Sequence, residues 1–94
     1  MTIDWTRNAK AQLLRLDDYI FERSPKGAER VVDDIYDAVN LLQNLPFLGR
    51  DGRVKGTREI VISKTPYVVA YRIQRETIEI LAVIHGAQRW PETF

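Results

Sequence analysis

The chain has 94 residues, carries no cysteine and has a formal net charge of +1. A chain of this length is expected to form one domain, residues 1–94, and without cysteine it can hold neither disulfides nor thiolate metal sites. Apolar residues make up 45% of the sequence, which is enough for a core, but no apolar run approaches the ~20 residues of a membrane span. Because no signal peptide is visible either, we expect a cytoplasmic protein.

The small net charge hides a segregation of charge along the chain. Acidic side chains gather in the first half at Asp17, Asp18, Asp33, Asp34 and Asp37. Basic side chains crowd the second half at Arg50, Arg53, Lys55, Arg58, Lys64, Arg72, Arg75 and Arg89. A basic half can meet nucleic acid or an acidic protein partner, which are electrostatically similar.

Two amphipathic helices are predicted after a short β-prone segment at Ile3–Trp5. Thr6 serves as N-cap of the first helix, which fades near Ser24 because Pro25 disfavours the helical region for the residue before it. Ser24 and Pro25 are in turn typical of the start of a second helix, which stops at Pro46. The apolar positions are Ala9, Leu13, Leu16 and Ile20 in the first helix and Ala28, Val31, Val32, Ile35, Val39, Leu42 and Leu45 in the second. The two form a helical hairpin that needs a surface to cover.

A basic, glycine-punctuated loop over residues 46–56 leads into three predicted strands at Thr57–Ile62, Tyr67–Ile73 and Thr77–Ile84. Simple hairpins place Ile62 opposite Tyr67, Ile60 opposite Val69, Tyr71 opposite Ile80, and Val69 opposite Ala82. These side chains then share one face with Ile78 and Ile84, and this face packs against the helices. The expected fold class is α+β, with an N-terminal α-helical hairpin on a three- to four-stranded antiparallel β-sheet.

The opposite face of this sheet is unusually apolar for a surface that meets water. It is expected to carry Glu59, Val61, Val68, Ala70, Arg72, Glu79, Leu81, Val83 and His85. Scattered apolar side chains are normal on protein surfaces, so strand propensity alone is one explanation. Because the apolar residues lie contiguous across three strands, we favour a partner protein that covers Val61, Val68, Ala70, Leu81 and Val83.

His85 is the only histidine, and it stands at the end of the last predicted strand, where a general base could act. A single histidine is more often structural than catalytic, and we favour a structural role. No second histidine, cysteine or carboxylate cluster lies at ligand spacing, so we expect no metal and no cofactor.

Four basic residues in and after the loop, Arg50, Arg53, Lys55 and Arg58, form a candidate phosphate- or target-binding set. A solvated basic loop is an equally good interpretation, and the residues alone leave both open.

Two further pairs have structural interpretations that we favour. Arg72 and Glu79 face each other in the predicted hairpin, which favours a cross-strand ion pair. Trp90, followed by Pro91, could stack on a base or fill a partner's pocket. We expect it instead to pack at the core or at a sheet edge.

Short motifs follow one another in order along nearly the whole chain. They are Trp5…Ala9…Leu13…Tyr19-Ile20, Pro25…Ala28, Leu42…Pro46…Gly49-Arg50, Gly56-Thr57-Arg58-Glu59, Pro66-Tyr67…Tyr71-Arg72 and His85-Gly86-Ala87…Arg89. In order and spacing they resemble the RelE/ParE superfamily of bacterial type II toxin–antitoxin modules, and its ParE-like branch in particular. The resemblance implies a toxin that is neutralised by a cognate antitoxin, whose extended segment wraps the toxin's sheet and helices in a hetero-oligomer.

The resemblance leaves three functions open. ParE-type toxins inhibit DNA gyrase without catalysis of their own, and we favour this function. RelE-type toxins cut mRNA in the ribosome, with basic residues on the sheet and an acid–base tyrosine or histidine near the C-terminus. Here Val68 stands where such an enzyme tends to place an arginine, so only a reduced site of His85 and Arg89, with Arg58 as anion stabiliser, remains. The third function is antitoxin binding alone, in a toxin that has lost its activity.

Overall fold

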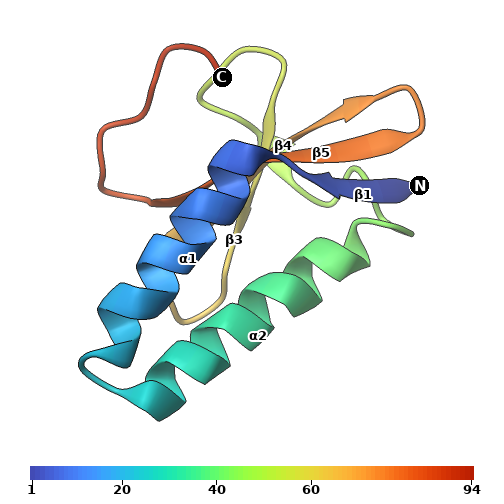
Figure 1. Cartoon of the computed structure of the whole chain (residues 1–94). Coiled ribbons are helices and arrows are strands. Elements are labelled where there is room, and N and C mark those ends of the chain that lie inside the picture. The colour runs from blue at the N-terminus through green and yellow to red at the C-terminus, as the bar shows by residue number, and fades with distance from the viewer.

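In the computed structural model, which describes residues 1–94, two helices pack against one face of a five-stranded sheet (Figure 1). The elements are β1 (Thr2–Trp5), α1 (Arg7–Phe21), α2 (Pro25–Leu41), β2 (Arg50–Asp51), β3 (Arg58–Val61), β4 (Tyr67–Gln74) and β5 (Thr77–His85). The strand order is β1-β5-β4-β3-β2. The predicted α+β fold with an N-terminal helical hairpin is therefore confirmed.

Both helices begin at the predicted caps. The Thr6 hydroxyl accepts a hydrogen bond from the N–H of Ala9 at 3.3 Å, and the Ser24 hydroxyl accepts one from the N–H of Gly27 at 3.0 Å. Pro25 follows in the first turn of α2, where its missing N–H is not needed. The end of α2 was predicted at residue 46, but the helix stops at residue 41 and continues only as turns.

The sheet is mixed rather than wholly antiparallel. β1 runs parallel to β5, with Ile3 opposite Ile78. At the other edge the two-residue strand β2 pairs Arg50 with Glu59. The predicted antiparallel order holds for β3, β4 and β5. The correction concerns the two edges, where β1 joins in parallel and β2 adds a short further strand.

A β-bulge in β5 changes which of its residues face the helices. Tyr71 lies opposite Ile80 as predicted, but Ala70 already lies opposite Ala82, so Leu81 is an extra residue. Since side chains alternate with a period of two, one extra residue exchanges the two faces for the rest of the strand. The predicted pairing of Val69 with Ala82 is therefore wrong, as are the predicted faces of Ala82, Val83, Ile84 and His85.

The main core lies between the helices and the sheet. Ala9, Leu13 and Leu16 of α1 meet Ile35, Val39 and Leu42, and both sets cover Ile60, Ile62, Val69, Tyr71, Ile78, Ile80 and Val83. Burial of each large aliphatic side chain contributes about 1.5–3 kcal/mol, which neither helix nor sheet could gain alone. Neither helix has the length and apolar content that crossing a bilayer requires.

Side chains of α1 replace β1 along the last part of β5. Asn8 Nδ2 donates a hydrogen bond to the carbonyl of Leu81 at 3.0 Å, and Gln12 Oε1 accepts one from the N–H of Val83 at 2.8 Å. An unpaired strand edge invites pairing with another chain. Because these backbone groups are already satisfied, a partner cannot add a strand here without moving α1.

Candidate functional site

The outer face of the sheet, which is the face turned away from the helices, is covered by the chain's own last residues. Val68 is 3% exposed, Leu81 is 6% exposed, and Trp90 packs on the buried side chains of Ala70, Ala82 and Ile84. Of the residues predicted to await a partner, only Val61 is exposed, at 54%. The expectation of an uncovered face is therefore wrong, because Trp90 packs on it.

We call residues 86–94 the C-terminal tail, and Arg53 fastens it to the sheet. Arg53 Nη1 donates a hydrogen bond to the carbonyl of Gly86 at 2.9 Å, and its guanidinium carbon lies 4.2 Å from the centre of the Trp90 ring. Figure 1 shows the tail (red) beside the loop between β2 and β3, which carries Arg53. The loop and the tail thus form one surface over the outer face.

Glu59 anchors the same loop from below. Its side chain is 1% exposed, and its carboxylate lies 3.3 Å from Arg50 Nη2 and 3.6 Å from Arg53 Nε. The carboxylate also accepts a hydrogen bond from the backbone N–H of Arg53 at 2.7 Å. A buried carboxylate is stable only with such partners. The side chains of Arg50 and Arg53 remain 58% and 43% exposed, so both can still reach a ligand.

The other two predicted basic residues lie apart from this cluster. Arg58 Nη1 donates a hydrogen bond to the carbonyl of Gly49 at 2.8 Å, and its guanidinium lies 4.9 Å from the centre of the Phe47 ring. Lys55 is exposed and makes no hydrogen bond or ion pair. The four residues therefore do not form one continuous patch. Arg50 and Arg53 gather around Glu59, and Lys55 extends from the loop beside them.

Tyr71 holds the segment that leads into β2. Its buried hydroxyl donates a hydrogen bond to the carbonyl of Pro46 at 2.8 Å and accepts one from the N–H of Gly49 at 2.9 Å. A Cβ at Gly49 would lie 2.6 Å from the Tyr71 oxygen, so only glycine fits this close approach. Burial raises the pKa of Tyr71, against smaller lowering effects of the Gly49 hydrogen bond and of Arg58.

His85 lies at the end of β5, exposed to solvent. Its Nδ1 accepts a hydrogen bond from the N–H of Ala87 at 3.1 Å, and its ring meets Tyr67 edge-on with 5.8 Å between centres. The neutral ring therefore carries its proton on Nε2. Burial, and next the nearby Tyr19, raise the pKa of Tyr67. The favoured structural role of His85 agrees with these contacts.

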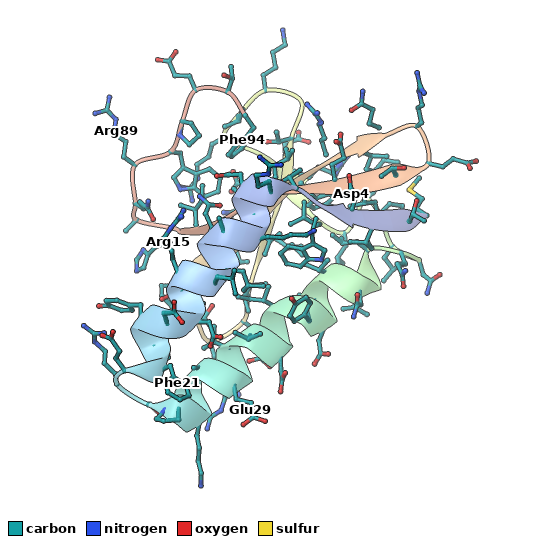
Figure 2. The ribbon with its side chains drawn as sticks, in the orientation of Figure 1. Asp4, Arg15, Phe21, Glu29, Arg89 and Phe94 are labelled. Atoms are coloured by element: carbon teal, nitrogen blue, oxygen red, sulfur yellow. The ribbon has the colours of Figure 1, made fainter.

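The three candidate catalytic residues do not converge. Arg58 lies opposite Tyr71 and His85 lies opposite Tyr67, so four residues of β4, about 13 Å, separate them along the strand direction. Arg89 follows in the tail, and Figure 2 shows its side chain pointing away from the ribbon. Acid–base catalysis needs its groups within hydrogen-bond reach of one substrate. This arrangement does not provide that reach.

Two smaller predictions are settled by contacts. Arg72 Nε lies 2.7 Å from Glu79 Oε1, which confirms the cross-strand ion pair. Trp90 packs, as expected, but on the outer face. No group of three or more histidine, aspartate or glutamate side chains is placed to hold a metal ion.

Comparison with known proteins places this fold in a family. The sequence model for the ParE toxin of the type II toxin–antitoxin system parDE matches residues 3–90. The toxin candidate Y4kP of Sinorhizobium fredii is 44% identical over 90 residues, which cover 96% of this chain and 93% of that protein. Toxin RelE2 of Caulobacter vibrioides is 32% identical over 84 residues, which cover 89% of this chain and 93% of that protein.

A solved structure has the same fold. It is described as the chromosomal ParDE toxin–antitoxin system from P. aeruginosa, and it matches with a TM-score of 0.83 at 30% identity over 90% of this chain and 95% of that chain. The family match spans almost every element from β1 to the tail, Trp90 included. The chain belongs to the ParE family of toxins of type II toxin–antitoxin modules.

Proposed function

We propose that this toxin arrests growth in the cytoplasm by inhibiting DNA gyrase and that a cognate antitoxin neutralises it. The separation of His85, Arg89 and Arg58 is the observation that carries the proposal. Without converging acid–base groups, a ParE-family chain acts by binding its target rather than by cutting a substrate. Growth arrest by a bound toxin requires only a surface that fits the target.

The target-binding surface in this proposal is the basic loop. The side chains of Arg50 and Arg53 stay partly exposed despite their contact with Glu59, and the side chain of Lys55 is exposed and makes no ion pair. Arg58, which is tied to Gly49, contributes by fixing the loop's base. Exposed cations of this kind attract acidic protein surfaces and phosphates, and salt screens them.

The expected result of adding the purified toxin to gyrase is loss of supercoiling of relaxed plasmid. The double variant Arg50→Gln/Lys55→Gln should need about ten times more protein for half inhibition, which corresponds to ~1.4 kcal/mol of lost binding energy. Lys10→Gln, an exposed position on α1, should inhibit like the unchanged toxin because it removes a charge outside the basic loop. Supercoiling that continues at a large excess of toxin contradicts gyrase as the target.

The relative named RelE2 supports a second candidate, cleavage of ribosome-bound mRNA. In that case His85 and Arg89, with Arg58, would carry the reaction. We expect no cleavage of ribosome-bound mRNA by the purified chain, and we expect His85→Ala to arrest growth as the unchanged toxin does. Cleavage that disappears in His85→Ala would establish the nuclease instead. If overexpression without antitoxin proves harmless, the chain only binds its antitoxin.

For the antitoxin we propose an extended segment on the outer face, over Val61, Val68, Ala70 and Leu81. Val83 no longer belongs to this set, because the bulge turns it towards the helices, where it joins the main core. Three of the four remaining residues are buried beneath the tail in the free chain. The segment can therefore reach them only after the tail has moved.

A further inference from the structure

The last six residues are held by packing and by the contact of the Trp90 ring with Arg53. At the start of the tail, Gly86 donates a backbone hydrogen bond to the carbonyl of Pro66 at 2.7 Å, and Gln88 donates one to the carbonyl of His85 at 2.9 Å. Residues 89–94 take part in no hydrogen bond and no ion pair. Segments with few such bonds are the ones that open at low free-energy cost.

Trp90 is the main anchor of these residues, and it is an imperfect one. Its ring rests on Ala70, Ala82 and Ile84 and lies against Arg53. Its indole N–H is buried without a hydrogen-bond partner. A buried donor that has left water without finding an acceptor opposes the gain from burying the ring. The loss of hydrogen bonding at the indole N–H therefore offsets part of the free energy that burial of the Trp90 ring contributes to the closed position.

Packing beneath the tail is also incomplete. A pocket of about 530 Å³ lies between the tail, the start of α1 and the outer face. Its floor includes Leu81 and Ile84, its wall includes Pro91 and Phe94, and Arg72 lies at its rim. Three arginines, Arg50, Arg53 and Arg72, border this face and share only two carboxylates, those of Glu59 and Glu79, so the face keeps an excess of positive charge. An occupant that fits this face is apolar and negatively charged.

We propose that the C-terminal tail is a latch and that its release opens the outer face to an extended, acidic and apolar segment of a partner protein. Trp90 is the resident occupant, and an apolar side chain of the partner replaces its ring on Ala70, Ala82 and Ile84. Opening also releases Arg53 from Gly86 and Trp90, so a carboxylate of the partner segment can bind it. That the partner is the antitoxin rests on the proposed function, whereas the opening of the latch does not.

The tail and the partner segment compete for the same surface, because both pack on Ala70, Ala82 and Ile84. If only a fraction of the chains has an open tail, the partner's apparent Kd is raised by the inverse of that fraction. Removing the tail therefore strengthens binding, although it deletes residues that lie beside the site. A tail that contributed to the partner's binding surface would have the opposite effect.

Opening is tested first on the toxin alone. In a Trp5→Phe background Trp90 is the only tryptophan, and quenching of its fluorescence by acrylamide reports its exposure. We expect Arg53→Gln to raise the quenching constant several-fold, because the variant loses the contacts with Gly86 and Trp90. Lys55→Gln, in the same loop but without a hydrogen bond or ion pair to the tail, should leave it unchanged. Equal shielding of Trp90 in both variants overturns the latch.

Docking is tested with the cognate antitoxin. A chain that ends after Gln88 keeps every hydrogen bond of the fold, and we expect it to bind the antitoxin about tenfold more tightly or better. Trp90→Ala in the full chain should act in the same direction and serves where the shortened chain fails to fold. Unchanged or weaker binding in both variants overturns the docking proposal. Gyrase inhibition, assayed separately, tests the proposed function, so a failure of one leaves the other standing.

Discussion

Glu59→Ala is expected to lower the free energy of unfolding by about 2–3 kcal/mol. The carboxylate is buried, and the substitution leaves the N–H of Arg53 without its acceptor and two guanidinium groups without their counter-charge. The cost stays below that of a fully buried ion pair because solvent screens the half-exposed arginines. In a domain of this size the melting temperature should fall by roughly 10–20 °C, and urea unfolding at pH 7 measures the energy directly.

Two other variants show how much the charge and the burial of Glu59 each contribute. Glu59→Gln keeps an acceptor for the N–H of Arg53 and should lose about half as much stability. Glu79→Ala breaks an ion pair with Arg72 that is partly exposed, and it should cost less than ~1 kcal/mol. If Glu59→Ala is no more damaging than Glu79→Ala, the buried carboxylate does not hold the loop.

The parts of the fold that could be predicted depend on local chemistry. A hydroxyl at Thr6 and the pair Ser24-Pro25 satisfy or avoid the free N–H groups of a helix start, wherever the helix later packs. The alternation of apolar residues likewise marked β4 and β5 and the pairing of Tyr71 with Ile80. These signals lie within a few residues of the feature that they specify, and the structure confirms them.

The bulge at Leu81 depends on distant residues instead. Its neighbouring backbone groups are bound by Asn8 and Gln12, which lie more than seventy positions earlier in the chain. No periodicity within β5 reports that contact, because Leu81, Ala82, Val83 and Ile84 are all apolar. The predicted faces of the strand's end were therefore wrong, although the strand itself was found.

The outer face shows a similar division. The alternation of residues in the strands predicted that this face is apolar. It did not predict that the tail covers the face, because the tail has no periodic pattern, and a partner protein was expected there instead. The sequence indicated that Trp90 packs against the fold, but it did not indicate on which face of the sheet. Glu59 directly follows the basic stretch from Arg50 to Arg58, and this position could have indicated that it pairs with the arginines. Neither residue could be placed without the turn at Gly86 and the loop that carries Arg53.

Tyr71→Phe is expected to cost about 2–3 kcal/mol of stability at pH 7, because the carbonyl of Pro46 and the N–H of Gly49 both lose their partner. Tyr36→Phe is the matched control. Its hydroxyl makes no hydrogen bond and the side chain is 43% exposed, so it should stay within about 0.5 kcal/mol. Denaturant unfolding of the three proteins checks both values. A loss as small as that of the control would mean that the loop after α2 is fixed without the phenol.

The same phenol should make stability depend on alkaline pH. Burial raises the pKa of Tyr71 above its unfolded value of about 10. The folded state then holds its proton more tightly, so this contribution is complete below pH ~10 and is lost as the pH rises through the folded pKa. Tyr67, whose pKa is also raised, adds a parallel loss that both proteins share. Between pH 9 and 11 the unchanged toxin should therefore lose stability more steeply than Tyr71→Phe, and equal slopes would show that the buried phenol ionises as easily as an unfolded one.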